Sequence, residues 1–195
     1  MPIPMPSPEP SPPPAGQRPP SRRGRRARAG ALALAVTAMV AGPTAGVAQE
    51  EGIALGATPE PVVLETLDGE PVDLAELFGT RPVLLEFWAT WCAICQALHP
   101  RMSAAHAAYG DDVEFLVVAA AVAQDQATVK RHLQRRPVAG RVLWDTEGRA
   151  TRAFEAPGTG YVVLLDAEGE VAYTGTGTDQ DIAGAIRSML EGAAP

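Results

Sequence analysis

The stretch Pro82-Val83-Leu84-Leu85-Glu86-Phe87-Trp88-Ala89-Thr90-Trp91-Cys92-Ala93-Ile94-Cys95 decides the fold. Its apolar run predicts a buried central strand over 83–88, then a short turn and a helix that begins at the Cys-x-x-Cys pair. The strand end fixes the first thiol in space, and a helix N-terminus stabilises a thiolate and lowers the pKa of its thiol. This arrangement suits thiol–disulfide exchange.

Turn residues and apolar periodicity divide the rest of the chain into short alternating segments. The predicted strands are 61–67, 71–74, 83–88, 113–122, 142–144, 161–166 and 171–174. The predicted helices are 92–109, kinked at Pro100, 124–135 and 179–190, with shorter helical turns at 74–78 and within 145–154. This order predicts parallel crossovers followed by an antiparallel finish in one mixed sheet.

The N-terminal quarter differs in composition from the rest. Residues 1–28 are rich in proline and arginine and are expected to be a disordered leader. Residues 29–48 follow the arginines with a short apolar segment that ends in small residues. This order of basic, apolar and small residues is typical of a secretory signal; an uncleaved membrane anchor is the alternative. Residues 49–60 are predicted to be a linker, and 61–195 a single domain.

Charge and cysteine content exclude several functions. Residues 1–48 hold six of the 16 Lys and Arg and one of the 23 Asp and Glu, so the remainder carries 10 cations, 22 anions and a formal net charge of −12. Such acidity argues against nucleic-acid binding. The chain has two cysteines, too few for a disulfide scaffold or a four-ligand structural zinc site.

The segment from Val83 to Cys95 resembles the active-site strand of thioredoxin-like proteins, most nearly the exported TlpA/ResA/CcmG branch of thiol–disulfide oxidoreductases. Supporting marks are the Asp68-Gly69 turn, Pro100 and the turn at Asp166-Ala-Glu-Gly169. The resemblance implies a thioredoxin-like three-layer α/β/α sandwich whose mixed central sheet carries an N-terminal β-hairpin. It implies no cofactor and no bound metal, and we expect a monomer.

Position assigns different roles to the two cysteines. Cys92, partly exposed at the helix N-terminus, is predicted to attack a target disulfide. Cys95, one turn deeper, is predicted to attack Cys92 and release the target, which leaves a Cys92–Cys95 disulfide. Glu86 interrupts an apolar strand, and the resemblance implies that it accepts the proton of Cys95. The alternative is a strand carboxylate that reaches solvent or a neighbouring cation.

Further residues are expected around this pair. Trp91, Ala93 and Ile94 are predicted to contact targets, whereas Trp88 is predicted to lie in the core. The family has a cis-proline where this chain has Gly160, so Thr159 and Gly160 are expected to face Cys92. The family also carries a carboxylate where this chain has Leu98, and His99, His106 and His132 are interpreted as helix-surface residues.

Two function classes compete. The favoured class is an exported oxidoreductase that reduces disulfides of cytochrome c apoproteins or other exported proteins, recharged by a membrane electron donor of the CcdA/DsbD kind. The alternative is a protein that binds or delivers a soft metal such as copper through the same cysteine pair. Copper-delivery relatives typically have Cys-x-x-x-Cys, so the spacing here favours the oxidoreductase.

Overall fold

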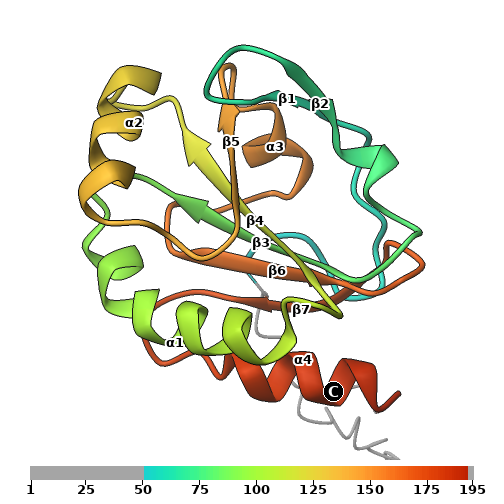
Figure 1. Cartoon of the computed structure of the whole chain (residues 1–195). Coiled ribbons are helices and arrows are strands. Elements are labelled where there is room, and N and C mark those ends of the chain that lie inside the picture. The colour runs from blue at the N-terminus through green and yellow to red at the C-terminus, as the bar shows by residue number, and fades with distance from the viewer. Residues whose placement is uncertain (1–50, 193–195) are drawn as a thin grey trace, which may run out of the picture. The chain divides into compact units, whose positions relative to one another are not determined.

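The computed structural model of the protein describes residues 51–192 (Figure 1). The predicted leader, signal or anchor segment and first residues of the linker lie outside the described residues. Between residues 51 and 192, no helix combines the length and apolar character needed to cross a membrane.

A seven-stranded mixed sheet forms the centre of the domain, in the order β2-β1-β5-β4-β3-β6-β7. β3, β4 and β5 are parallel, whereas β6 is antiparallel to β3, and β7, at the edge, is antiparallel to β6. The hairpin of β1 and β2 joins the other side of the sheet, where Glu65 pairs with Trp144. The strands are β1 (Val63–Glu65), β2 (Pro71–Asp73), β3 (Val83–Trp88), β4 (Glu114–Ala120), β5 (Arg141–Asp145), β6 (Tyr161–Leu165) and β7 (Val171–Gly175).

Helices cover both faces of this sheet, as Figure 1 shows. One face, which carries Leu84, packs against α1, α2 and α4. The other face, which carries Leu85, packs against α3, η1 and the segment around Ile53. The helices are η1 (Leu74–Glu76), α1 (Ala93–Tyr109), α2 (Gln126–Arg135), α3 (Arg149–Ala153) and α4 (Ile182–Leu190). The predicted three-layer thioredoxin-like sandwich with its N-terminal hairpin is therefore confirmed.

The position of β3 follows from its composition. All six of its residues are buried, which requires apolar cover on both faces of the sheet. Burial of each large aliphatic side chain contributes roughly 1.5–3 kcal/mol, so this strand anchors the core. Its C-terminal end leads into the turn that carries the cysteines, so the site is built on a fully buried strand of the sheet.

The linker prediction differs from the structure over residues 53–57. The Ile53 N–H donates to the Phe154 carbonyl oxygen (3.2 Å) and to the Tyr161 hydroxyl oxygen (3.1 Å), and the Ile53 side chain is buried. The Gly56 N–H donates to Val171 O (2.8 Å), on the edge strand β7. A single isoleucine among small residues carries no periodic signal, so this docking was not visible in the sequence.

Element ends also shift by one to three residues. Cys92 caps α1 instead of belonging to it, and Asp125 caps α2 by accepting a hydrogen bond from the Thr128 N–H (2.7 Å). Both caps have non-helical backbone angles, as N-cap residues do. Pro100 lies inside α1, which continues through it to Tyr109.

Candidate active site

Cys92 and Cys95 are joined by a disulfide at the N-terminus of α1. The Cys92 sulfur accepts a hydrogen bond from the Cys95 N–H (3.0 Å), so it satisfies one of the free donors at the start of the helix. The Cys95 sulfur lies 3.8 Å from the Phe87 carbonyl oxygen, at the end of β3. The strand end and the helix start therefore hold both sulfurs against the sheet.

Cys92 is more buried than predicted. Its exposed fraction is 3%, against 2% for Cys95, so the bonded pair does not divide into an exposed and a shielded sulfur. Cys92 belongs to an apolar cluster with Trp88, Ala89 and Val117. The expectation of a partly exposed Cys92 is wrong for this oxidised state.

Glu86 lies in the middle of β3, between Val117 of β4 and Val162 of β6. Strand alternation places it on the face that carries Trp88, the face covered by α1. Its side chain is buried, and Oε1 has no hydrogen-bond partner within the described part of the chain. Loss of solvation raises the pKa of Glu86 to about 8, so the carboxyl holds its proton at neutral pH. A carboxylate paired with a cation, the alternative interpretation, does not fit these surroundings.

Gly160 lies against Ile94 of the Cys-x-x-Cys turn. Its φ is +86°, its N–H donates to Phe87 O (2.7 Å), and none of the described peptide bonds is cis. A Cβ atom at this position would lie 2.6 Å from Ile94 Cγ2, a distance that no real side chain tolerates. Ile94 therefore fills the space in front of Gly160, and the glycine is required by both the backbone angle and the contact. Thr159, the preceding residue, is partly buried.

A second loop supports the turn before the cysteines. The Thr90 N–H and hydroxyl both donate to Gln124 Oε1 (2.9 and 2.8 Å), and the Trp91 indole N–H donates to Val122 O (2.9 Å). Trp91 is 49% exposed and Val122 is 62% exposed, and Ala93 is exposed as well. The disulfide is therefore bordered by apolar side chains that a partner could contact. Gln124 and Val122 carried no sequence signal.

Gln180 fixes the other side of the site. It is buried, and its side-chain amide donates to Gly160 O (3.1 Å) and to Gly177 O (2.9 Å). The Tyr173 hydroxyl donates to Gln180 Oε1 (3.3 Å). These hydrogen bonds of Gln180 therefore hold the Gly160 loop in place. A glutamine among loop residues gave no sequence signal of this role.

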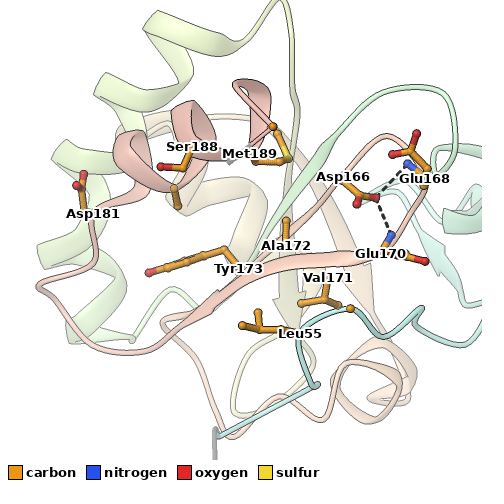
Figure 2. Close-up of a pocket in the computed structure, with 13 residues that line it drawn as sticks. Leu55, Asp166, Glu168, Glu170, Val171, Ala172, Tyr173, Asp181, Ser188 and Met189 are labelled. Carbon is orange, nitrogen blue, oxygen red and sulfur yellow. Dashed lines mark hydrogen bonds between the residues drawn. The ribbon is translucent and has the colours of Figure 1, made fainter. Parts of the chain in front are cut away.

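Two hollows in the described part of the chain differ in charge. One, of about 750 Å³, lies between β7 and α4 and is bordered by Asp166, Glu168, Glu170 and Asp181 (Figure 2). Neither cysteine lines it, and Figure 2 shows Asp166 accepting hydrogen bonds from the N–H groups of Glu168 and Glu170, which hold the turn between β6 and β7. The other hollow, of about 350 Å³, includes Cys95.

His99 and His132, expected on helix surfaces, line the second hollow together with Cys95. The His106 ring contacts Phe115 edge-on, with 5.0 Å between ring centroids. Among residues 51–192, no three His, Cys, Asp or Glu side chains are grouped as metal ligands would be.

A disulfide-bonded Cys-x-x-Cys pair at a helix N-terminus, on a thioredoxin-like sandwich, defines a thiol–disulfide oxidoreductase. Comparison with known proteins agrees: the Redoxin family model matches residues 42–189, and the chain belongs to this family.

Individual relatives point the same way. The chain is 30% identical to the thiol-disulfide oxidoreductase ResA of Bacillus subtilis over 132 residues. This aligned region covers 67% of this chain and 72% of ResA. A secreted disulfide oxidoreductase of Mycobacterium tuberculosis, homologous to E. coli DsbE, superposes with a TM-score of 0.56 at 25% identity, over 65% of this chain and 95% of that one. StoA of Bacillus subtilis shares the fold at 21% identity, with a TM-score of 0.55, over 67% of this chain and 97% of StoA.

Proposed function

We propose that this protein is an exported thiol–disulfide oxidoreductase that reduces disulfides of target proteins through Cys92 and Cys95. The observation that carries the proposal is the position of Cys92: it is the N-cap of α1, where its sulfur already accepts the Cys95 N–H. Free N–H groups and the positive end of the helix dipole stabilise negative charge on that sulfur. Cys92 is therefore the nucleophile of the reduced protein.

The reaction is two successive exchanges. The Cys92 thiolate attacks one sulfur of the target disulfide, a Cys92–target bond forms, and the other target sulfur leaves as a thiolate. Cys95 then loses its proton and attacks Cys92, so the second target sulfur also leaves as a thiolate. The target gains two electrons, and the enzyme ends with the Cys92–Cys95 bond that the structure contains.

In its ionised form, Glu86 is the proton acceptor for Cys95 in this scheme. Burial raises the pKa of Glu86 to about 8, close to that of an ordinary thiol at about 8.5. A carboxyl whose pKa is raised toward the range of thiols is better suited to exchange a proton with a thiol than an ordinary carboxyl is. A Glu86→Gln variant is expected to resolve the mixed disulfide more slowly, with a changed pH profile; unchanged resolution across pH would exclude the role.

Target binding is assigned to the rim of the disulfide. Trp91, Ala93 and Ile94 offer exposed apolar surface, and Thr159 and Gly160 form the facing loop. Gly160 itself is buried, with its N–H bonded to Phe87 O and its carbonyl oxygen to the Gln180 side chain, so in this loop contact with a partner is assigned to Thr159 and the exposed face of Ile94. These contacts would position a target disulfide over Cys92.

We further propose that the protein acts outside the cytoplasm as a monomer. Support comes from the sequence order of an export signal in residues 29–48, either cleaved or kept as an anchor, and from the relative in Mycobacterium tuberculosis, which is secreted. A membrane donor of the CcdA/DsbD kind would return the protein to its dithiol form, and cytochrome c apoproteins are the proposed targets. Mass determination of the exported protein would distinguish a new N-terminus near residue 49 from an intact anchor.

A redox titration tests the central claim. The purified protein is equilibrated in dithiol buffers of defined potential, and its thiols are alkylated and counted by mass. A two-electron transition at about −250 mV or below supports a reductant that needs a dedicated donor, whereas about −120 mV indicates an oxidant that installs disulfides. Absence of a two-electron transition would refute exchange chemistry at Cys92 and Cys95.

A further inference from the structure

The hollow that includes Cys95 is formed between α1 and α2; we call it the basic cavity. α1 contributes Cys95 with its neighbours, and α2 and the chain after it form the opposite wall. Its side chains include Cys95, Gln96, His99, His132, Arg136 and the indole of Trp88. A group bound there would lie beside Cys95, the residue that completes the exchange.

The side chains that line the basic cavity carry no negative charge. Three of them are histidine or arginine, and none is aspartate or glutamate. The contrast with the acidic hollow of Figure 2 is complete, since that one is bordered by four carboxylates and by no cation. In a chain whose residues 49–195 carry a net charge of −12, a positive cavity beside the reactive bond is a specific feature.

Arg136 is free to bind an added anion. Lys130, on α2, pairs with Asp68 (2.6 Å), whereas no carboxylate within residues 51–192 lies within 4 Å of the guanidinium of Arg136, the residue that ends this helix. Four of the ten Lys and Arg of residues 49–195 fall at positions 130, 131, 135 and 136, so the neighbourhood is positive as well. An unpaired guanidinium at the mouth of a cavity is suited to a bidentate carboxylate contact.

His132 contributes hydrogen bonding more than charge. Its ring contacts Trp88 edge-on, with 5.3 Å between ring centroids. Burial, followed by the charges of Arg136 and Arg135, lowers the pKa of His132, so the ring is neutral at pH 7. His99 lies across the cavity, its Nε2 3.5 Å from the Ser103 hydroxyl. A carboxylate in this space would meet one fixed positive charge and two imidazole rings.

We propose that the basic cavity binds an aspartate or glutamate side chain of the target, so that the enzyme selects disulfides that have an acidic residue close to one cysteine. The inference rests on the proposed function, because it places the acidic residue in a segment held to Cys92 during exchange. The acidic side chain anchors the segment while Cys95, in the wall of the same cavity, attacks. Arg136 is thus a specificity residue that takes no part in the chemistry.

Disulfide peptides test this selection. Each probe carries a Glu, Gln or Lys residue at one position, and that position is varied over the four residues before and the four residues after one cysteine. The probes are otherwise identical. For the reduced wild-type protein at low salt, kcat/KM for the best Glu peptide is expected to exceed that of its Gln counterpart about tenfold, as one charge-assisted hydrogen-bonded pair provides. Arg136→Glu is expected to abolish this ratio and to favour the Lys peptide.

Arg135→Glu is the matched control. It changes the net charge by the same amount one residue away, and Arg135 is exposed and does not line the cavity. This variant is expected to keep most of the Glu-to-Gln ratio. Because each ratio compares two peptides on one enzyme preparation, partial misfolding of a variant cancels.

The outcomes separate the two claims. If the wild-type protein reduces all peptides at similar rates, or if Arg135→Glu and Arg136→Glu lower the ratio equally, the basic cavity is not the selecting site, while the proposed function stands. If it reduces none of the peptides, the proposed function fails and the inference fails with it.

Discussion

Replacement of Glu86 by glutamine should change how stability depends on pH. Burial raises the pKa of this carboxyl to about 8, while its ordinary value, which applies to the unfolded chain, is 4.5. Between these values the folded protein holds a proton that the unfolded chain has lost. The free energy of unfolding therefore falls as pH rises from 4.5 to 8. Below pH 4.5 the carboxyl is protonated in both states and has no such effect.

The size of the effect follows from that separation. At about 1.4 kcal/mol per pH unit, the ionisable carboxyl costs about 3 kcal/mol of stability at pH 7 and about 5 kcal/mol above pH 8. Glutamine has a similar shape and no ionisation, so it removes this pH-dependent cost. The variant and the wild-type protein should be about equally stable at pH 4, and the variant more stable by about 3 kcal/mol at pH 7.

Urea unfolding of both oxidised proteins from pH 4 to pH 8.5 measures the difference directly. All other titrating groups are shared, so subtraction of the two curves isolates Glu86. Glu168→Gln, which removes an exposed carboxyl in a turn, shows how large a difference a surface site leaves. A difference that stays flat over the whole range would mean that the Glu86 carboxylate is solvated or paired, and the proton-transfer role would lose its basis.

Three further substitutions probe the packing of the site and its surroundings. Gly160→Ala should destabilise the protein by about 2–4 kcal/mol, because alanine is strained in the left-handed backbone conformation and its Cβ atom would collide with Ile94. Adding Ile94→Ala should recover the part of the loss that comes from the collision. Thermal unfolding of the wild-type protein, the two single variants and the double variant measures that part. Asp145→Ala should cost about 2 kcal/mol in chemical unfolding, because this buried carboxylate accepts two N–H groups and a hydroxyl at the start of α3; a loss below 0.5 kcal/mol would contradict that account. Trp91→Ala should lower kcat/KM for protein disulfides while thermal stability changes by about 0.5 kcal/mol or less, since the ring is half exposed; equal turnover by variant and wild type would remove Trp91 from the target rim.

The central part of the fold could be predicted because its signals are local and agree with one another. The apolar run of 83–88 requires cover on both faces, the turns at Asp68-Gly69 and Asp166–Gly169 close hairpins, and the cysteine pair marks a helix start. Each of these features depends on residues that are neighbours in the chain. The order of elements then leaves few topologies open.

What could not be predicted depends on contacts between distant segments. Gln124 supports the turn at Thr90 from 34 residues away, and Gln180 holds Gly160 from 20 residues away. Nothing in the sequence near either glutamine distinguishes it from a surface residue. The burial of Cys92 likewise depends on packing against distant residues such as Val117, which the pattern around the cysteines does not encode.

The position of Glu86 links the two directions of the exchange. No residue of α1 is acidic, and Leu98 stands where the resemblance implies a second carboxylate, so the buried proton site on the sheet side of this helix is Glu86. In the oxidised protein this group is protonated at neutral pH, as its raised pKa of about 8 requires. When a donor thiolate attacks Cys92, the Cys95 sulfur leaves as a thiolate in apolar surroundings, where an unshared charge is costly. A protonated Glu86 can neutralise that thiolate, and the resulting carboxylate is ready to take the proton back when Cys95 next attacks. If Glu86 exchanges a proton with Cys95 as proposed, this single buried carboxyl, with a pKa of about 8, serves both reduction and recharging, and the cost in stability at neutral pH accompanies that role.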